Sequence, residues 1–439
     1  MSCNWPIVKL GDYCSKIGSG ATPKGGNSVY LDHGEISLIR SQNIYNEGFK
    51  SDGLVYITPE AAQKLKNVII EPNDVLINIT GDSVARVCLA PNEFLPARVN
   101  QHVAILRVDP EEFDHRYLRY FLTSTKMQNY LLTIASTGGT RNALTKSMLE
   151  SLEVSKPLLD VQKRIGDVLE SFESKIELNS RTNQTLEEMA QAIFKSWFVD
   201  FDPVKAKMNG EQPEGMDAAT ASLFPEKLVE SELGLIPEGW EVGELSDLMD
   251  FNPKRTLKKG TVAPYLDMKN MPTAGHLALD IYDREMGSGT KFVNGDALLA
   301  RITPCLENGK TAFVDFLEDE QVGWGSTEYI VMRSKSDSYK YFSYFMARFE
   351  PFRKFAIQSM TGTSGRQRAQ AKTVQTMPFV IPPLSILEKF DELIAANMQL
   401  IKRHGDENKT LAELRDTLLP KLLSGEIELG QAQELAEVE

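Results

Sequence analysis

The sequence predicts an α+β fold in which two similar domains of mixed helix and strand are separated by two long antiparallel helices, with a pseudo-twofold internal repeat. Three observations predict it. The first half of the chain recurs in order in the second half, and each copy is followed by a long helical pattern. Each copy also mixes short strand-like runs with glycine-rich turns, as expected for an α+β domain present twice.

The internal repeat is long and keeps its order. The matching segments are Trp5–Asp12 with Trp240–Asp247, Asp74–Thr80 with Asp296–Thr303, Asn100–Arg107 with Gly325–Arg333, Tyr117–Phe121 with Tyr341–Phe345, Thr137–Arg141 with Thr361–Arg366, and Pro157–Leu158 with Pro383–Leu384. A repeat of this length is a duplicated domain, because solenoid units are only about 20 to 50 residues long. Two similar units in one chain imitate a homodimer and suit a target that also has two halves.

The mixed domains are expected at residues 1–157 and 239–382. Short apolar runs favour strands, and a helical segment is expected near Tyr117 to Leu132. The strand-like runs include Val75–Ile79, Val103–Leu106 and Tyr329–Met332. Residues 205–238 form an acidic connector punctuated by proline and glycine, and residues 426–439 form an acidic tail.

The long helices are expected at residues 158–204 and 383–425, because apolar residues there alternate between spacings of three and four. Two helices of about 40 residues would each be about 60 Å long. Asn179, Asn183 and Asn408 interrupt the apolar seams near their midpoints, where polar residues fix register and partner choice. We expect the helices to pair antiparallel as a coiled-coil spacer. The alternative is that each helix packs on its own domain.

The net charge of −13 at first argues against a nucleic-acid partner, since phosphate contacts supply most non-specific affinity. The acids, however, are concentrated in two segments. Between Lys207 and Glu244 there are nine acids and two lysines, and five acids without any base follow Gly425. The rest of the chain is nearly neutral and can carry basic faces.

Composition also limits the class of protein. The four cysteines and five histidines are dispersed and lack metal-ligand or disulfide spacing, so ordinary structural roles are favoured. The N-terminal residues lack the pattern of a signal peptide, and no apolar run is long enough to cross a bilayer. A soluble cytoplasmic protein is the simplest interpretation.

Catalytic motifs are not recognisable. Gly309-Lys310-Thr311 resembles the end of a phosphate-binding loop, but Pro304 occupies the place of its first glycine. Glu173-Ser174-Lys175 has no acidic partner nearby in the sequence and suits a solvated helix face. Pro382-Pro383 lacks the flanking residues of an adenine-methylase motif.

Binding chemistry remains, in glycine-rich loops that carry hydroxyl, amide and cationic side chains. Arginine pairs bidentately with guanine, and asparagine or glutamine pairs with adenine. The candidate DNA-binding residues are Lys24, Arg40, Ser41, Asn43, Arg141, Asn142, Arg301, Thr363, Arg366 and Arg368. For any one loop, an ordinary glycine-rich turn with a solvated arginine is an equally good interpretation. Recurrence in both halves favours nucleic acid.

Two further segments carry a family resemblance. Leu186–Gly210 resembles the central conserved region of the specificity subunits of type I restriction-modification systems, and Thr410–Ile427 resembles their distal conserved region. The segments Trp5–Asp12, Gly20–Pro23, Asn100–Val103 and Thr137–Leu144 resemble the framework of a target recognition domain. The resemblance covers essentially the whole chain.

The resemblance implies that each recognition domain binds one half of a split double-stranded DNA target, with the antiparallel helices setting the gap. Two methyltransferase subunits would supply S-adenosylmethionine and methylate adenine, and two restriction subunits would add ATP- and Mg-dependent cleavage. This chain would hold no cofactor or metal and would do no chemistry. The residues expected to contact partner subunits are Phe194, Trp197, Phe198, Phe201, Leu419 and Leu422.

Two alternatives from other classes stay open on the residues alone. One is an enzyme with an unfamiliar site, which the lack of a carboxylate, cysteine or histidine cluster disfavours. The other is a protein-interaction scaffold with a coiled-coil spacer, since glycine- and arginine-rich loops bind carboxylates as well as phosphates.

Overall fold

A computed structural model describes residues 5–23, 25–136, 142–363 and 366–427. The chain divides into two compact units. Unit 1 comprises residues 1–176 and 410–439, and unit 2 comprises residues 177–409. Among the described residues, no helix is both long enough and apolar enough to span a bilayer.

Unit 1 contains a central antiparallel sheet of four strands in the order β2-β10-β7-β8 and a smaller sheet in the order β6-β3-β9. Residues in β7 and β10 are almost entirely buried, which explains their continuous apolar sequences. The strands are β1 (Ile7–Lys9), β2 (Cys14–Ser19), β3 (Ile36–Ile39), β4 (Ile44–Tyr45), β5 (Gly48–Phe49), β6 (Val55–Ile57), β7 (Val75–Asn78), β8 (Val87–Leu89), β9 (Ala97–Val99), β10 (Val103–Val108) and β11 (Glu153–Ser155). The helices are α1 (Pro59–Lys64), α2 (His115–Thr123), α3 (Thr125–Ser136) and α4 (Lys146–Glu150).

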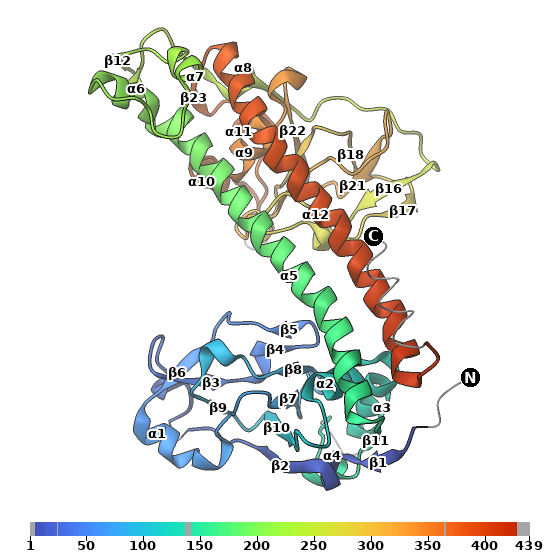
Figure 1. Cartoon of the computed structure of the whole chain (residues 1–439). Coiled ribbons are helices and arrows are strands. Elements are labelled where there is room, and N and C mark those ends of the chain that lie inside the picture. The colour runs from blue at the N-terminus through green and yellow to red at the C-terminus, as the bar shows by residue number, and fades with distance from the viewer. Residues whose placement is uncertain (1–4, 24, 137–141, 364–365, 428–439) are drawn as a thin grey trace. The chain divides into compact units, whose positions relative to one another are not determined.

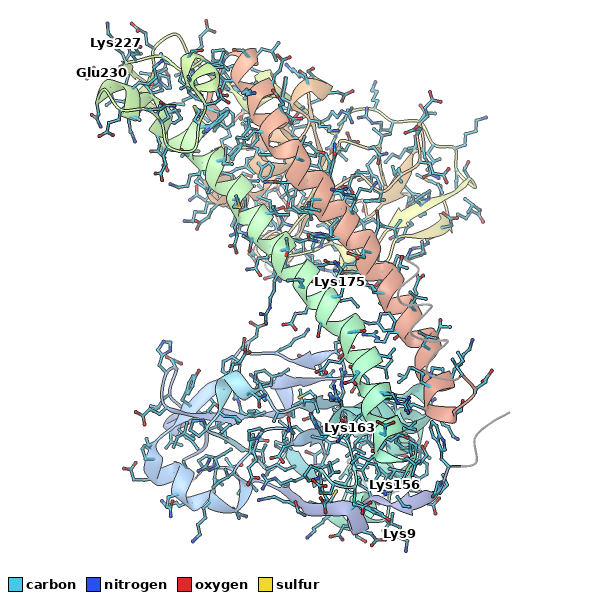
Figure 2. All side chains as sticks on the ribbon, in the orientation of Figure 1. Lys9, Lys156, Lys163, Lys175, Lys227 and Glu230 are labelled. Atoms are coloured by element: carbon cyan, nitrogen blue, oxygen red, sulfur yellow. The ribbon has the colours of Figure 1, made fainter. Side chains whose placement is uncertain are left out.

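The antiparallel pair β1–β11 joins the first and the last strand of the first domain. Lys9 and Lys156 lie at this pair (Figure 2). The ammonium of Lys156 is 2.7 Å from the Glu112 carboxylate and 4.9 Å from the centre of the Tyr13 ring. The start and the end of the domain are therefore joined by backbone pairing and by side-chain contacts.

Unit 2 repeats this plan with two four-stranded sheets, in the orders β15-β22-β19-β20 and β17-β16-β21-β18. Its strands are β12 (Leu228–Ser231), β13 (Gly234–Pro237), β14 (Glu241–Glu244), β15 (Met249–Phe251), β16 (Val262–Leu266), β17 (Tyr282–Glu285), β18 (Thr290–Phe292), β19 (Ala297–Ala300), β20 (Thr311–Phe313), β21 (Gly323–Gly325), β22 (Tyr329–Ser334) and β23 (Pro378–Ile381). Its short helices are α6 (Asp202–Met208), α7 (Ala218–Ser222), α8 (Leu245–Leu248), α9 (Phe342–Arg348), α10 (Glu350–Gln358) and α11 (Ala371–Val374).

The predicted internal repeat is confirmed by strand register. Ile105 of β10 pairs with Leu76 of β7, and Val331 of β22 pairs with Leu298 of β19 at the equivalent place. The parallel pair β3–β9 recurs as β16–β21, and the edge pair β1–β11 recurs as β14–β23. The predicted α+β class is therefore correct for both copies.

Two long helices, α5 (Leu159–Lys195) and α12 (Leu384–Ser424), are shared between the units. Their segments lie side by side in each unit (Figure 1). In unit 1 Arg415 approaches Glu173, and in unit 2 Asn179 bonds Asn408. Numbering rises along α5 as it falls along α12, so the pairing is antiparallel, as the apolar seams predict.

The polar residues within the seam contact one another. Asn179 is almost fully buried and donates to the Glu407 carboxylate at 2.6 Å. The side-chain oxygen of Asn183 lies 2.8 Å from Nδ1 of His404, and its amide donates to the Ile401 carbonyl. A one-turn slip of the helices would leave the buried Asn179 and the half-buried Asn183 unpaired, so they fix the register.

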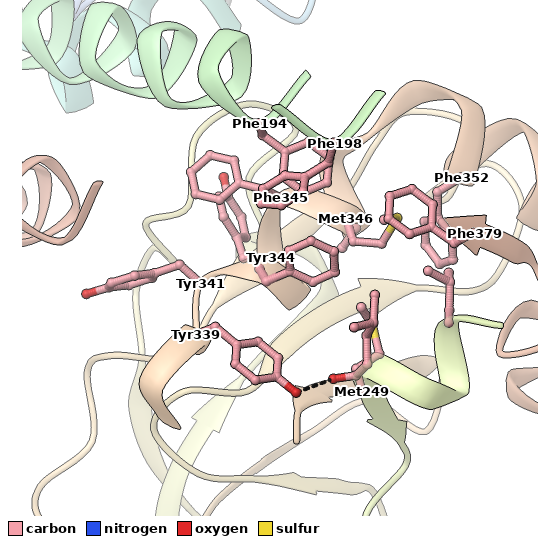
Figure 3. Close-up of a cluster of buried hydrophobic side chains, with 14 of the residues drawn as sticks. Phe194, Phe198, Met249, Tyr339, Tyr341, Tyr344, Phe345, Met346, Phe352 and Phe379 are labelled. Atoms are coloured by element: carbon pink, nitrogen blue, oxygen red, sulfur yellow. Dashed lines mark hydrogen bonds between the residues drawn. The ribbon is translucent and has the colours of Figure 1, made fainter. Parts of the chain in front are cut away.

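The apolar face at the end of α5 belongs to the core of unit 2. Phe194 and Phe198 pack against the rings of Phe342, Phe345 and other aromatic residues. Figure 3 shows Phe194, Phe198 and Phe345 within this cluster. In the same cluster, the Tyr339 hydroxyl donates to the Leu248 carbonyl at 3.1 Å. Regular helix ends at Lys195, and Ser196–Asp200 form a π-helical turn.

This packing corrects the expected partner contacts. Phe194, Trp197, Phe198 and Phe201 are buried in the core of unit 2, and Leu422 is buried in unit 1, where Leu419 packs partly buried against the same core. The five buried side chains expose little surface to another subunit, whereas the contact predicted for Leu419 stays a prediction. Their apolar spacing reflects packing within their own unit, which produces the same sequence pattern as a docking face.

Candidate nucleic-acid interface

Each unit brings three loop segments together at the end of its central sheet. In unit 1 these segments follow β7, precede β10 and precede α4. In unit 2 the equivalent segments follow β19, precede β22 and precede α11. Equivalent backbone bonds hold them: Ile79 N to His102 O (2.9 Å) and Leu144 N to Ile79 O (2.8 Å) in unit 1, and Arg301 N to Glu328 O (3.0 Å) and Ala369 N to Arg301 O (2.9 Å) in unit 2. Sequence reasoning placed candidate residues on these segments in both copies.

Site 2, defined as Arg301, Glu328, Arg366 and Arg368, is highly charged. Arg368 donates from Nε and Nη2 to the Glu328 carboxylate at 2.9 and 2.8 Å, and Arg301 donates from Nε at 3.2 Å. The hydrogen bonds from Arg368, together with the charge of Arg301, hold the pKa of Glu328 below its usual range. The structure thus brings Arg301 and Arg368 together around an acid that sequence reasoning had not selected.

Arg366 completes site 2 on the same loop. Its side chain is exposed, and its backbone carbonyl accepts a hydrogen bond from Nη1 of Arg368 at 3.3 Å. The backbone nitrogen of Arg366 donates to the carbonyl of Thr363, whose side chain is also exposed. These two predicted residues have side chains available to a ligand.

Site 1, defined as Thr22, Thr80, Gln101 and His102, occupies the equivalent place in unit 1. The Gln101 amide donates to Nε2 of His102 at 2.9 Å, and Nδ1 of His102 faces the Thr80 hydroxyl at 2.5 Å. The Thr22 hydroxyl bonds the side-chain oxygen of Gln101. His102 holds the position of Glu328, so the same backbone frame carries hydroxyl, amide and imidazole groups in unit 1 and arginines in unit 2.

Further predictions in unit 1 concern Lys24, Arg141 and Asn142. Asn142 is exposed and its carbonyl accepts from Gly81 N at 3.3 Å. Lys24 and Arg141 lie outside the described residues. Those two candidates stay predictions.

The segment Arg40–Asn43 is hydrogen-bonded to the loop formed by residues 50–53. Asn43, at the end of the 3-10 turn Ser41–Asn43, is fully buried, and its amide donates to the carbonyls of Lys50 and Asp52. We therefore correct the prediction for Asn43, because this side chain has no surface with which to contact DNA. Its repeat equivalent, Asn270, is also buried and donates to the Asp280 carbonyl.

Arg40 and Ser41 also contact the fold. Nη2 of Arg40 donates to the Gly53 carbonyl at 2.6 Å, and its guanidinium lies 5.2 Å from the centre of the Tyr30 ring. The carbonyl of Ser41 accepts from the Asn78 amide at 2.9 Å. Both residues remain half-buried, so part of each side chain stays accessible.

Both halves of the chain match one family model, described as the type I restriction modification DNA specificity domain, over residues 3–188 and 237–410. The chain belongs to this family. It is similar to the HindI specificity subunit of Haemophilus influenzae, with 27% identity over 97% of this chain and 100% of the relative. It is also similar to the MjaIX specificity subunit of Methanocaldococcus jannaschii, with 25% identity over 98% of this chain and 94% of the relative.

A solved structure supports the fold of this specificity subunit. The S subunit of M. genitalium matches 95% of this chain and 96% of its own, with a TM-score of 0.57 and 16% sequence identity. The family model and the two relatives confirm the predicted membership of the type I specificity-subunit family. The comparisons support DNA specificity and give no support to the scaffold alternative. Among the described residues, no cluster of three His, Cys, Asp or Glu residues could hold a metal ion.

The specificity subunit has one more feature that sequence reasoning missed. A pocket of about 240 Å³ in unit 2 is lined by the cations Arg255, Lys291 and Arg301 and by the neutral donors Asn252, Thr290 and Thr327. The basic run Lys254-Arg255 with Lys258-Lys259 was a signal for part of it. No sequence signal pointed to Lys291, because it is the single charged residue of the short strand β18.

Proposed function

We propose that this chain is the DNA-recognition subunit of a type I restriction-modification enzyme, in which each unit binds one half of a bipartite double-stranded DNA target. One observation carries the proposal: two domains share a backbone frame but present different polar side chains at the equivalent site. A shared frame allows the same mode of approach to DNA, and different side chains allow different half-sites to be bound.

The helices would set the distance between the half-sites. Their register is fixed by the contacts of the buried Asn179 and the half-buried Asn183, which supports a gap of constant length. Two pseudo-equivalent domains suit half-sites spaced by about one turn of DNA.

Catalysis would belong to partner subunits in the cytoplasm. Two methyltransferase subunits would carry S-adenosylmethionine and methylate adenine, and restriction subunits would supply ATP- and Mg-dependent cleavage. This chain would contribute binding and orientation only. The buried positions of Phe194 to Phe201 direct the search for the docking surface to other, exposed faces of the helices.

The test is to co-express the chain with a cognate methyltransferase subunit and to map adenine methylation on a genome that otherwise lacks it. We expect one bipartite motif with a fixed gap. Replacing residues 1–157 with another recognition domain should alter one half of the motif only. A well-formed complex that leaves no methylation motif would overturn the proposal.

A further inference from the structure

The pocket in unit 2 gathers positive charge from three separate segments. Arg255 lies on the connection after β15, Lys291 on β18, and Arg301 directly after β19. Among the described residues the lining contains no carboxylate, and its remaining polar side chains are the amide of Asn252 and the hydroxyls of Thr290, Thr327 and Tyr329, the last of which already donates to a backbone carbonyl. Hydrogen-bond donors therefore surround this pocket from several directions.

Both arginines are held in place by acids that do not line the pocket. Nη2 of Arg255 donates to the fully buried Asp296 at 3.0 Å, and Nε of Arg301 donates to Glu328 at 3.2 Å. Such support fixes an arginine before a ligand arrives and so lowers the entropic cost of binding. It also leaves donors unused. Within the described part of the chain, the buried Nε of Arg255 has no acceptor.

The supporting acids do not neutralise the site. Asp296 also approaches Arg333 at 3.4 Å, and Glu328 also bonds Arg368. Arg333 also pairs with Asp337, so that, with Lys291, five cations accompany three acids. The local field is positive, and it attracts an anion.

We propose that this pocket binds a phosphodiester group of the DNA backbone, which rests on the DNA-binding function proposed above. A phosphate presents acceptor oxygens in several directions and matches a pocket lined by three cations and by neutral side chains that can donate. A base edge presents a planar pattern, and most bases combine donors with acceptors. The phosphate contact would fix the position of unit 2 on the duplex without sequence information.

The pocket is a property of unit 2. Ile79 occupies the position of Arg301 in the repeat, as the equivalent backbone bonds to His102 and Glu328 establish. An isoleucine cannot donate a hydrogen bond from its side chain. Unit 2 would therefore contribute a phosphate contact that this position in unit 1 does not supply.

The test uses the complex of the full chain with its methyltransferase subunits and the variant Lys291→Gln. Lys291 supports no ion pair among the described residues, so its loss should leave the fold intact. We expect the affinity for specific and unrelated duplexes to fall by a similar factor, roughly three- to tenfold at moderate salt. The slope of log affinity against log salt should become shallower by about 0.9, the value for one phosphate contact, with the methylation motif unchanged.

Lys354→Gln is the matched control. It makes the same change in net charge, on an exposed lysine of α10 that pairs with Glu350. A salt slope of Lys291→Gln equal to that of this control would overturn the phosphate site. A change of one base in the motif would overturn it in favour of base recognition. Failure of the proposed function is distinct, because the unaltered complex would then produce no bipartite motif at all.

Discussion

The two recognition domains share a backbone frame and differ in the groups placed on it. At the same bend, unit 1 has His102 bonded to Gln101 and Thr80, whereas unit 2 has Glu328 bonded to Arg301 and Arg368. The backbone bonds beneath both sites are equivalent. The comparison shows that the duplicated fold preserves the loop positions, while the chemistry at those positions is free to diverge.

The domains also differ in how they attach to α5. In unit 1 the Tyr120 hydroxyl donates to Glu173 at 3.0 Å, and in unit 2 the equivalent Tyr344 donates to Glu187 at 2.6 Å. The Glu173 side chain is 27% exposed, but the Glu187 side chain is only 5% exposed and faces the fully buried His276. The same tyrosine contact is therefore partly solvated in one unit and dry in the other.

The largest effect on stability is expected at the buried contact between Tyr344 and Glu187. Glu187→Ala should destabilise unit 2 by about 3–5 kcal/mol, because it leaves the His276 charge with Asp315 alone in a buried site. Glu173→Ala removes the ion-pair partner of the buried Arg119, but it should cost less, about 1–3 kcal/mol in unit 1, since Glu173 is partly solvated and Arg119 keeps its hydrogen bond to the Asn46 carbonyl. Hydrogen exchange across the full chain can measure both. Equal losses would contradict the role assigned to burial.

The second prediction concerns pH in unit 2. Burial disfavours the charged form of His276, but the Asp315 carboxylate at 3.1 Å and Glu187 at 3.8 Å outweigh it and raise the pKa of His276 to about 9. Because this value lies above the ordinary value of 6.5, the stabilisation is complete below pH 6.5 and is lost as the pH rises through 9.

We therefore expect amide exchange in unit 2 to accelerate between pH 6.5 and 9 beyond the intrinsic chemical rate. His276→Gln should be less stable at pH 6 and should show a flatter pH dependence over this range. The unaltered Glu173 attachment in unit 1 serves as the internal reference. An identical pH profile for His276→Gln and the unaltered chain would refute the assignment.

The third prediction compares the two loop-supporting asparagines. Asn43→Ala removes three hydrogen bonds of a fully buried side chain, and Asn270→Ala removes one at the equivalent turn of unit 2. We expect losses of about 1–3 kcal/mol for Asn43 and about 1 kcal/mol for Asn270 in chemical denaturation. Neither variant should change the methylation motif once folded. A changed base in the half bound by unit 1 would restore Asn43 as a DNA contact.

The smallest effect on stability is expected at Arg366. Its side chain is exposed, so Arg366→Ala should change the free energy of unfolding by less than about 0.5 kcal/mol. Its DNA affinity should nevertheless fall in a salt-titrated binding assay. Asn142→Ala, also exposed and on the corresponding loop of unit 1, is the comparison. Unchanged DNA binding by both variants would remove these loops from the interface.

Periodicity and repetition in the sequence determined most of the architecture. The internal repeat predicted two similar domains. The spacing of apolar residues by three and four predicted α5 and α12, because this periodicity shows which face of a helix is buried. The register-fixing role of Asn179 and Asn183 was also predictable, since a polar residue within an apolar seam stands out. These are local or repeated signals, and they can be recognised without knowing which segments meet.

Only the tertiary structure determined which groups each polar or apolar side chain contacts. The sequence could not show whether Phe198 packs in the core of unit 2 or at a subunit interface, because both places require an apolar helix face. It could not distinguish Asn43 as a loop support from Asn43 as a base contact, because both use the same amide. Nor could it bring Lys291 to Arg255 and Arg301, since a pocket built from three distant segments exists only once the chain has folded around it.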